Sequence, residues 1–216
     1  MSFGIAGKAR FAVAATLLVL TSACKIVSID EDRAMRERRS GKIDAGAVVA
    51  RDWQGRLLPE LTKSAVNLAE IWPAIARDPA AAGAAHGRQA SEGANWTFVV
   101  KGQGRVVSVD DTSRSGAVRL AVPGVGDVAI QTGPVLVSTA VRDAIPSLRF
   151  DDFPDQMAFA AVNKALNAKA LESATRNRAL LREGAEVSFV GVMHMGEPGQ
   201  AAVIVPVALG AAAQGG

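Results

Sequence analysis

The chain of 216 residues is 49% hydrophobic and 21% charged, with 24 basic and 21 acidic residues, a composition that excludes a wholly disordered protein. Its single cysteine and two histidines exclude an internal disulfide, a cysteine-based zinc site and a multi-histidine metal centre. Tyrosine is absent and aromatic residues make up only 5%, which leaves little material for stacking nucleic-acid bases. We therefore expect no metal, no other cofactor and no nucleic-acid partner.

The first 23 residues have the pattern of an export signal. Lys8 and Arg10 precede an apolar run, Phe11–Leu20, which is shorter than the ~20 residues that span a bilayer as a helix. Thr-Ser-Ala and the only cysteine, Cys24, follow this run. The order is typical of a bacterial lipobox, in which the cysteine is acylated and becomes the new N-terminus, although Thr21 stands where Leu, Val or Ile is usual. An ordinary secretory signal and an uncleaved N-terminal anchor are the alternatives.

Cleavage before Cys24 would leave a nearly neutral protein. It removes two of the 24 basic residues and no acidic one, so the formal net charge falls from +3 to +1. Such a surface exerts no long-range attraction on polyanions. Lys25 follows the cysteine in place of the aspartate that commonly retains lipoproteins in the inner membrane, which is compatible with outer-membrane sorting. We expect a lipid-anchored protein on the periplasmic side of the cell envelope.

Residues 24–92 predict an N-terminal anchor followed by a helical subdomain. Three helix N-caps are predicted in this region, at Asp44, Ser64 and Asp78, because each precedes an apolar helical pattern. Pro73 predicts a break or a kink within the second helix.

Residues 93–216 predict a small closed or half-closed β-barrel. Six segments show the alternation or the apolar character of short strands: Trp96–Lys101, Arg105–Asp110, Ala117–Val122, Val128–Thr132, Glu186–Met195 and Ala201–Leu209. The first two are separated by Gly-Gln-Gly, so they form either a hairpin or one strand that bends at the glycines. Pro206 lacks a backbone N–H group and is expected at a sheet edge or a strand end.

A helical insertion, at about residues 134–183, separates the early strands from the late ones. Within it, apolar side chains recur at helical spacing at Phe159, Val162, Leu166 and Ala170. OB-like folds are commonly arranged in this way. The predicted fold class is therefore α+β, a small OB-like β-barrel with a helical N-terminal subdomain and with helices inserted between its early and late strands.

Four runs of sequence resemble one bacterial family: KIVSIDEDRAMRERRSGKIDA after the cysteine, residues 127–153, ALNAKAL and EVSFVG. The family consists of predicted periplasmic lipoproteins called domain of unknown function 2291. The resemblance implies an OB-like barrel with a helical part, genes often found beside those of sugar ABC transporters, and no established enzymatic activity. It carries Cys24 over as the lipidation site. We therefore expect a non-enzymatic accessory or binding protein that associates with a sugar ABC transport system.

The most polar part of the family-like stretch is a candidate binding surface formed by Thr139, Arg142, Asp143 and Asp151. A sugar or a peptide is the ligand that such a surface would contact. The alternative is structural, because Arg142 paired with either aspartate would form an internal ion pair that fixes a helix on the barrel.

An envelope enzyme that acts on glycans through paired carboxylates is the alternative function, with Asp151, Asp152 and Asp155 as candidates. These residues also fit the D-D-x-x-D pattern that holds Mg²⁺ on one face of a helix, but Pro154 opposes a helix through the motif. A simpler interpretation is that Asp152 caps the helix that follows. No G-x-S-x-G motif provides a nucleophile.

His194 is expected on a late strand, between Met193 and Met195. Its ring either turns inward with a satisfied hydrogen bond or faces solvent. A role as a base, or as a Cu(I) ligand together with the methionines, is the sharper alternative.

Overall fold

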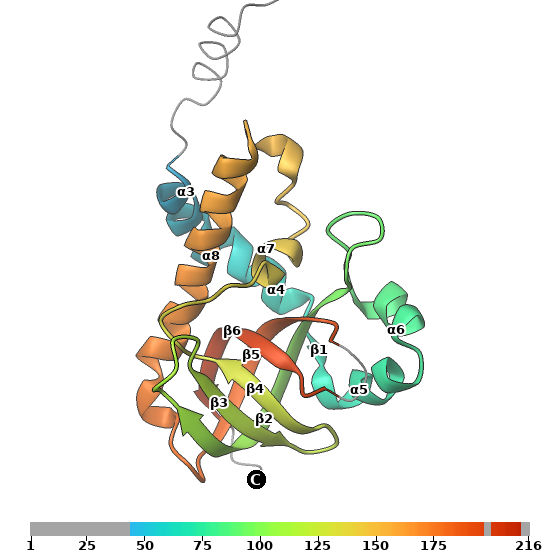
Figure 1. The fold of residues 1–216 in the computed structure, drawn as a ribbon, viewed down its shortest axis with the longest axis vertical. Coiled ribbons are helices and arrows are strands. Elements are labelled where there is room, and N and C mark those ends of the chain that lie inside the picture. The colour runs from blue at the N-terminus through green and yellow to red at the C-terminus, as the bar shows by residue number, and fades with distance from the viewer. Residues whose placement is uncertain (1–43, 197–199, 213–216) are drawn as a thin grey trace, which may run out of the picture. The chain divides into compact units, whose positions relative to one another are not determined.

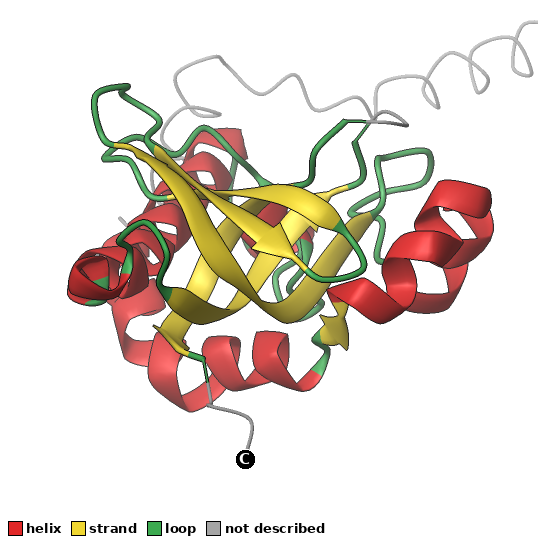
Figure 2. Cartoon of the chain, turned by 90° about the horizontal axis from the view of Figure 1, so that it is seen from below, coloured by secondary structure: helices red, strands yellow, loops and turns green. Residues whose placement is uncertain are grey.

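The computed structural model describes residues 44–196 and 200–212 (Figure 1). The predicted signal peptide and Cys24 lie outside the described residues. Within them, five strands form a barrel: β2 (Thr97–Asp110), β3 (Ala117–Val122), β4 (Gly126–Gln131), β5 (Glu186–His194) and β6 (Val203–Ala211). The strands follow the order β2-β3-β4-β6-β5, and β5 pairs again with β2, so the barrel closes. Figure 2 shows the strands curving around the barrel, with helices on its outside.

Strand β2 belongs to both halves of the barrel. Thr97–Arg105 pairs with β5, and Arg105–Asp110 pairs with β3. A register shift between Val106 and Ser108 marks a bulge at this change of partner. Of the two alternatives, a hairpin or one strand bent at the glycines, the structure shows one strand, and its irregularity lies beyond the glycines. Gly104 permits the close approach of β3, because a Cβ atom there would lie 2.6 Å from the backbone oxygen of Ala121.

Two details of the sheet differ from the expectation. A two-residue strand, β1 (Val66–Asn67), pairs in parallel with β2 and was not predicted, because two residues carry no alternation. Pro206 lies buried inside β6 and not at an edge or a strand end. It pairs with Gly191 where the β5–β6 register shifts, and such an irregularity tolerates a residue without an N–H group.

The N-terminal helices form a continuous run and then a pair. The run consists of α3 (Ala45–Asp52), the π-helical η2 (Trp53–Leu57) and α4 (Leu58–Lys63), and the pair consists of α5 (Leu68–Arg77) and α6 (Pro79–His86). The caps at Asp44 and Asp78 are confirmed, since each carboxylate accepts a hydrogen bond from a backbone N–H in the first turn of its helix.

Two predictions about the second helix are wrong. Ser64 ends α4, where its hydroxyl donates to the Leu61 carbonyl, and Asn67 caps α5 by accepting a hydrogen bond from the Ala69 N–H. The helix also continues through Pro73. Burial of Leu68 and Ile71 stabilises this helix enough to offset the one hydrogen bond that the proline removes.

The insertion between β4 and β5 contains a short helix, α7 (Ala140–Asp143), and a long one, α8 (Gln156–Arg176), which confirms the inserted helices. It also contains two 3₁₀ turns, η3 (Phe150–Asp152) and η4 (Arg178–Leu180). The N-cap of α8 is Asp155, which accepts a hydrogen bond from the Ala158 N–H at 2.8 Å. The prediction that Asp152 caps this helix is therefore wrong, because Pro154 delays the start of the helix by three residues.

The helices and the barrel share buried surface. Trp53, Leu57 and Leu61 pack in one cluster with Val192 of β5 and Leu166 of α8, and a second cluster fills the barrel. The predicted boundary between residues 92 and 93 does not divide the core, because the short N-terminal helices bury their apolar faces against the barrel and the inserted helices.

The contact between β5 and β6 provides a test of the barrel. A Cβ atom at Gly191 would lie 2.3 Å from Cγ2 of Ile204 and 2.8 Å from the oxygen of Val205. We expect Gly191→Ala to lower the free energy of unfolding by about 1–3 kcal/mol in urea titrations, because the strands must move apart. Gly210→Ala is the control, since its nearest contact is 3.4 Å. Equal stability of the two variants would contradict the packing.

Candidate functional site

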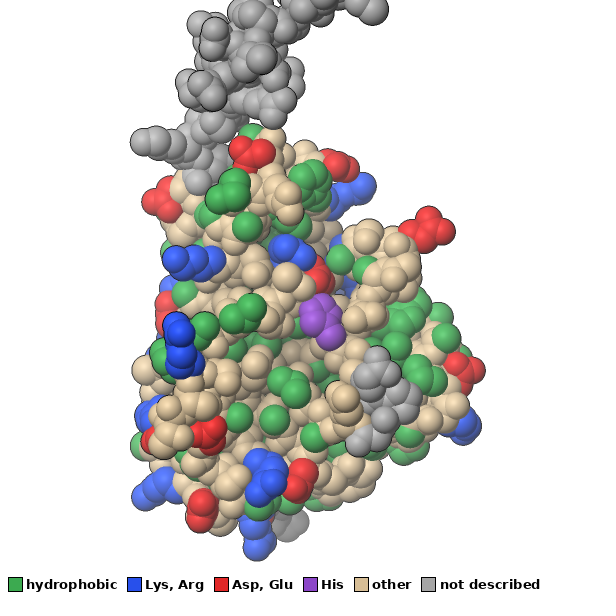
Figure 3. All heavy atoms as spheres, in the orientation of Figure 1, with side chains coloured by type: hydrophobic (Ala, Val, Ile, Leu, Met, Phe, Trp, Pro, Cys, Tyr) green, Lys and Arg blue, Asp and Glu red, His purple; other side chains and the backbone are tan. Residues whose placement is uncertain are grey.

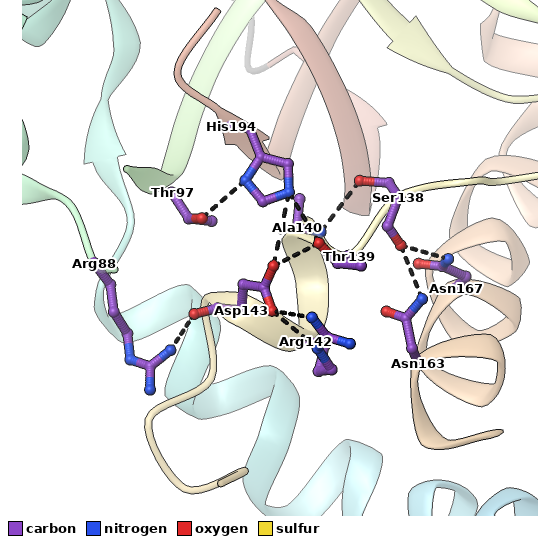
Figure 4. Close-up of polar contacts among 10 residues, drawn as sticks. All are labelled: Arg88, Thr97, Ser138, Thr139, Ala140, Arg142, Asp143, Asn163, Asn167 and His194. Carbon is purple, nitrogen blue, oxygen red and sulfur yellow. Dashed lines mark hydrogen bonds and ion pairs between the residues drawn. The ribbon is translucent and has the colours of Figure 1, made fainter. Parts of the chain in front are cut away.

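The candidate site lies where the start of β2 and the end of β5 meet α7 (Figure 4). Thr97 and His194 are register partners on these two strands. Thr97 also exchanges two backbone hydrogen bonds with Arg88, each 2.8 Å long, which holds Arg88 at this end of the barrel. Strand pairing therefore places three residues from distant parts of the sequence beside α7.

His194 connects the barrel to α7. Its Nδ1 lies 3.0 Å from Oγ1 of Thr97, and its Nε2 lies 3.2 Å from Oγ1 of Thr139. Thr97 is 2% exposed, and about a third of the histidine side chain is exposed. Both ring nitrogens have partners, so the inward interpretation of His194 with satisfied hydrogen bonds is the one that the structure supports.

The hydroxyl of Thr139 is committed to Asp143. It donates its single proton to Oδ2 of Asp143 at 2.5 Å. A hydrogen bond between Thr139 and His194 then requires that Nε2 carries the proton and donates it to the hydroxyl oxygen. In this arrangement Nε2 cannot accept the hydroxyl proton as a base. Thr139 thus positions α7 and is not arranged as a nucleophile.

Asp143 is the centre of the polar network. It is 8% exposed, and its Oδ1 accepts hydrogen bonds from Nε and Nη2 of Arg142 at 2.9 and 2.6 Å. Its backbone carbonyl accepts a hydrogen bond from Arg88, and Nε2 of His194 lies 3.8 Å from its Oδ2. The guanidinium of Arg142 also stacks on the ring of Phe159, 4.4 Å from the centroid. The aspartate therefore fixes two arginines and α7.

A cleft of about 480 Å³ opens beside this network, within the range of small-molecule sites. Its charged lining consists of Arg88, Arg142, Arg149, Asp143 and Asp151, and two aromatic rings, Phe150 and Phe159, form part of its wall. Arginine is the side chain best suited to planar, bidentate recognition of anions.

The structure brings the four predicted surface residues together. Thr139 and Arg142 each form a hydrogen bond with Asp143. Arg142, Asp143 and Asp151 line the cleft, whereas Thr139 lies outside its lining. Arg142 forms an ion pair with Asp143, as the structural alternative predicted, and both residues also line the cleft. Sequence reasoning missed the part played by Arg88, Thr97 and Phe159, because no local pattern links residues that only strand register and helix packing join.

The carboxylates proposed for glycan chemistry do not gather in the cleft. Asp152 accepts a hydrogen bond from the Arg149 N–H, and Asp155 caps α8. Only Asp151 of the three lines the cleft. Among residues 44–196 and 200–212, no three His, Cys, Asp or Glu side chains are grouped in a way that could hold a metal ion.

The sheet face that OB folds use for oligonucleotides and oligosaccharides offers no stacking surface here. Strands β3 and β4 direct alanines outward, together with an exposed ion pair in which Arg119 lies 3.7 Å from Asp127. On the molecular face in Figure 3, basic and acidic side chains are interspersed and neither forms a continuous patch.

Comparisons with known proteins agree on the family and the fold. A family model described as "Predicted periplasmic lipoprotein (DUF2291)" matches residues 14–210. A solved OB-fold protein from Thermotoga maritima superposes with a TM-score of 0.62 at 15% sequence identity, covering 78% of this chain and 98% of that chain. This likeness confirms the α+β, OB-like fold class. No curated protein matches the chain.

None of the described helices is long and apolar enough to span a membrane.

The ion pair within the network provides a test of the site. We expect Asp143→Asn to lower the free energy of unfolding by about 2–3 kcal/mol, because it leaves the largely buried Arg142 without its counter-charge. Asp127→Asn is the matched control. It removes the partner of an exposed arginine and should cost less than about 1 kcal/mol. Urea titrations that give equal losses would contradict the central role of Asp143.

Proposed function

The chain belongs to the DUF2291 family of predicted periplasmic lipoproteins, and from that premise we propose that it is a lipid-anchored, non-enzymatic binding protein that serves a sugar ABC transport system. Membership of the family gives it a periplasmic, envelope-associated location. The observation that carries a binding role is the cleft beside α7, where a buried aspartate holds Arg142 in one orientation.

The anchor in this proposal is Cys24. It follows an apolar run of signal-peptide length and is the only cysteine in the chain. A single acyl chain gives only marginal membrane binding, whereas several chains on one residue give stable anchoring. Lys25 at the next position supports sorting to the outer membrane as part of the same proposal.

Binding, and not turnover, is what the polar groups of the site support. The Thr139 hydroxyl donates its hydrogen bond to Asp143, and that carboxylate is neutralised by Arg142. Asp152 and Asp155 are engaged with backbone N–H groups. Groups that are already fixed lower the entropic cost of holding a ligand. The link to sugar uptake comes from the family resemblance.

Radiolabelled palmitate provides the test of the anchor. We expect cells that produce the native protein to incorporate the label into it and to retain it in the membrane fraction. The Cys24→Ser variant should lose both the label and the membrane association, because serine cannot form the thioether. A density gradient then shows whether the labelled protein lies in the inner or the outer membrane. An unlabelled protein in the cytosol would contradict both the export signal and the lipid anchor.

Co-purification provides the test of the partner. The full chain, extracted from membranes with mild detergent, should retain a sugar transporter component or its periplasmic binding protein, identified by mass spectrometry. We expect Asp151→Asn, in the cleft, to weaken this retention, whereas Asp127→Asn, on β4 and outside the cleft lining, should not. Hydrolysis of an envelope glycan by the native protein but not by Asp151→Asn would contradict the non-enzymatic assignment.

A further inference from the structure

Three arginines line the cleft beside α7, and several of their N–H groups have no hydrogen-bond acceptor within the described part of the chain. Arg88, Arg142 and Arg149 share this wall with two carboxylates, Asp143 and Asp151. The formal net charge of the cleft lining is therefore +1, from three arginines and two aspartates. Such a charge, carried by arginines in a partly enclosed space, attracts a ligand with one negative charge.

Arg142 presents a preformed edge to the cleft. Its Nε and Nη2 each donate one hydrogen bond to Asp143, and one face of its guanidinium lies on the Phe159 ring. Three of its five N–H bonds then have no acceptor within the described part of the chain. Because the group is already held in place, ligand binding costs little further side-chain entropy.

Arg88 supplies a second fixed donor. One Nη1 hydrogen bond goes to the Asp143 carbonyl, and its backbone is paired with Thr97. Both arginines therefore contact the same aspartate, and both line the same cleft. Two adjacent guanidinium groups match the two oxygens of a carboxylate.

The rest of the wall indicates the body of the ligand. Phe150 is 51% exposed and meets Phe159 edge to face, with ring centroids 5.4 Å apart, so it offers an apolar surface. Asp151 is exposed and can accept hydrogen bonds from hydroxyl groups. A volume of about 480 Å³ is ample for a molecule of monosaccharide size.

We propose that this cleft binds a small hydroxylated monocarboxylate, with its carboxylate on Arg142 and Arg88 and its hydroxyl groups facing Asp151. The inference rests on the proposed binding function and names the ligand class of that same cleft. A phosphate dianion is a poorer match, because one net positive charge would not neutralise it.

Calorimetric titration of the detergent-solubilised full chain tests the ligand class. Sodium D-glucuronate is the probe, and neutral D-glucose at the same ionic strength is its matched control. We expect saturable binding of glucuronate and at least tenfold weaker binding of glucose. Equal affinity for the two, no binding of glucuronate, or tighter binding of inorganic phosphate than of glucuronate would each overturn the proposal.

Variants locate the binding. Arg142→Lys keeps the charge but loses the planar fork, and we expect at least tenfold weaker glucuronate binding. Arg149→Gln removes an exposed cation at the cleft and should weaken binding at least threefold, and it keeps the test valid if Arg142→Lys does not fold. Arg119→Gln, outside the cleft, should bind as the native protein does. Unchanged binding in Arg149→Gln would overturn the site.

Failure of this inference is distinguishable from failure of the proposed function. If glucuronate does not bind but a transporter component still co-purifies with the native chain, the ligand class is wrong and the accessory role stands. If neither occurs, both are wrong.

Discussion

The pairing of β2 with two partners is the constraint on which the rest of the structure depends. Its first half bonds to β5 and its second half to β3, so one bent strand closes the barrel. The same pairing sets Thr97 opposite His194 and brings Arg88 to the end of the barrel. Without this register the side chains that meet α7 would lie on separate edges. A one-residue slip would turn each of them to the other face.

Asp143 holds α7 on the barrel and also shapes the wall of the cleft. A buried carboxylate is costly unless it is neutralised and hydrogen bonded, and here Arg142 and Thr139 satisfy it. In return, Asp143 orients the guanidinium of Arg142, a residue that lines the cleft. Because one residue fixes α7 on the barrel and also shapes the cleft, substitutions at this position are expected to affect folding and binding together.

Local signals in the sequence predicted the elements but not all of their ends. Strand alternation between residues 96 and 132 identified the early strands, and Asp44 and Asp78 cap helices as predicted. Ser64 and Asp152 are wrong as caps, because an Asn or Asp three residues further along stands where helical geometry begins. Competing cap residues that lie close together have equal local preference, and the decision between them comes from packing and from Pro154.

The sequence by itself determined the strands of the barrel, the inserted helix and the cluster of Thr139, Arg142 and Asp143, because these depend on periodicity or on residues within one turn of a helix. It also determined that Cys24 is the one thiol available for acylation. The tertiary structure alone decided that Arg88, Thr97, His194 and Phe159 join this cluster, and that Arg88 and Phe159 line the cleft beside it. They come from four segments, and only strand register and the packing of α8 on the barrel bring segments so distant in sequence into contact.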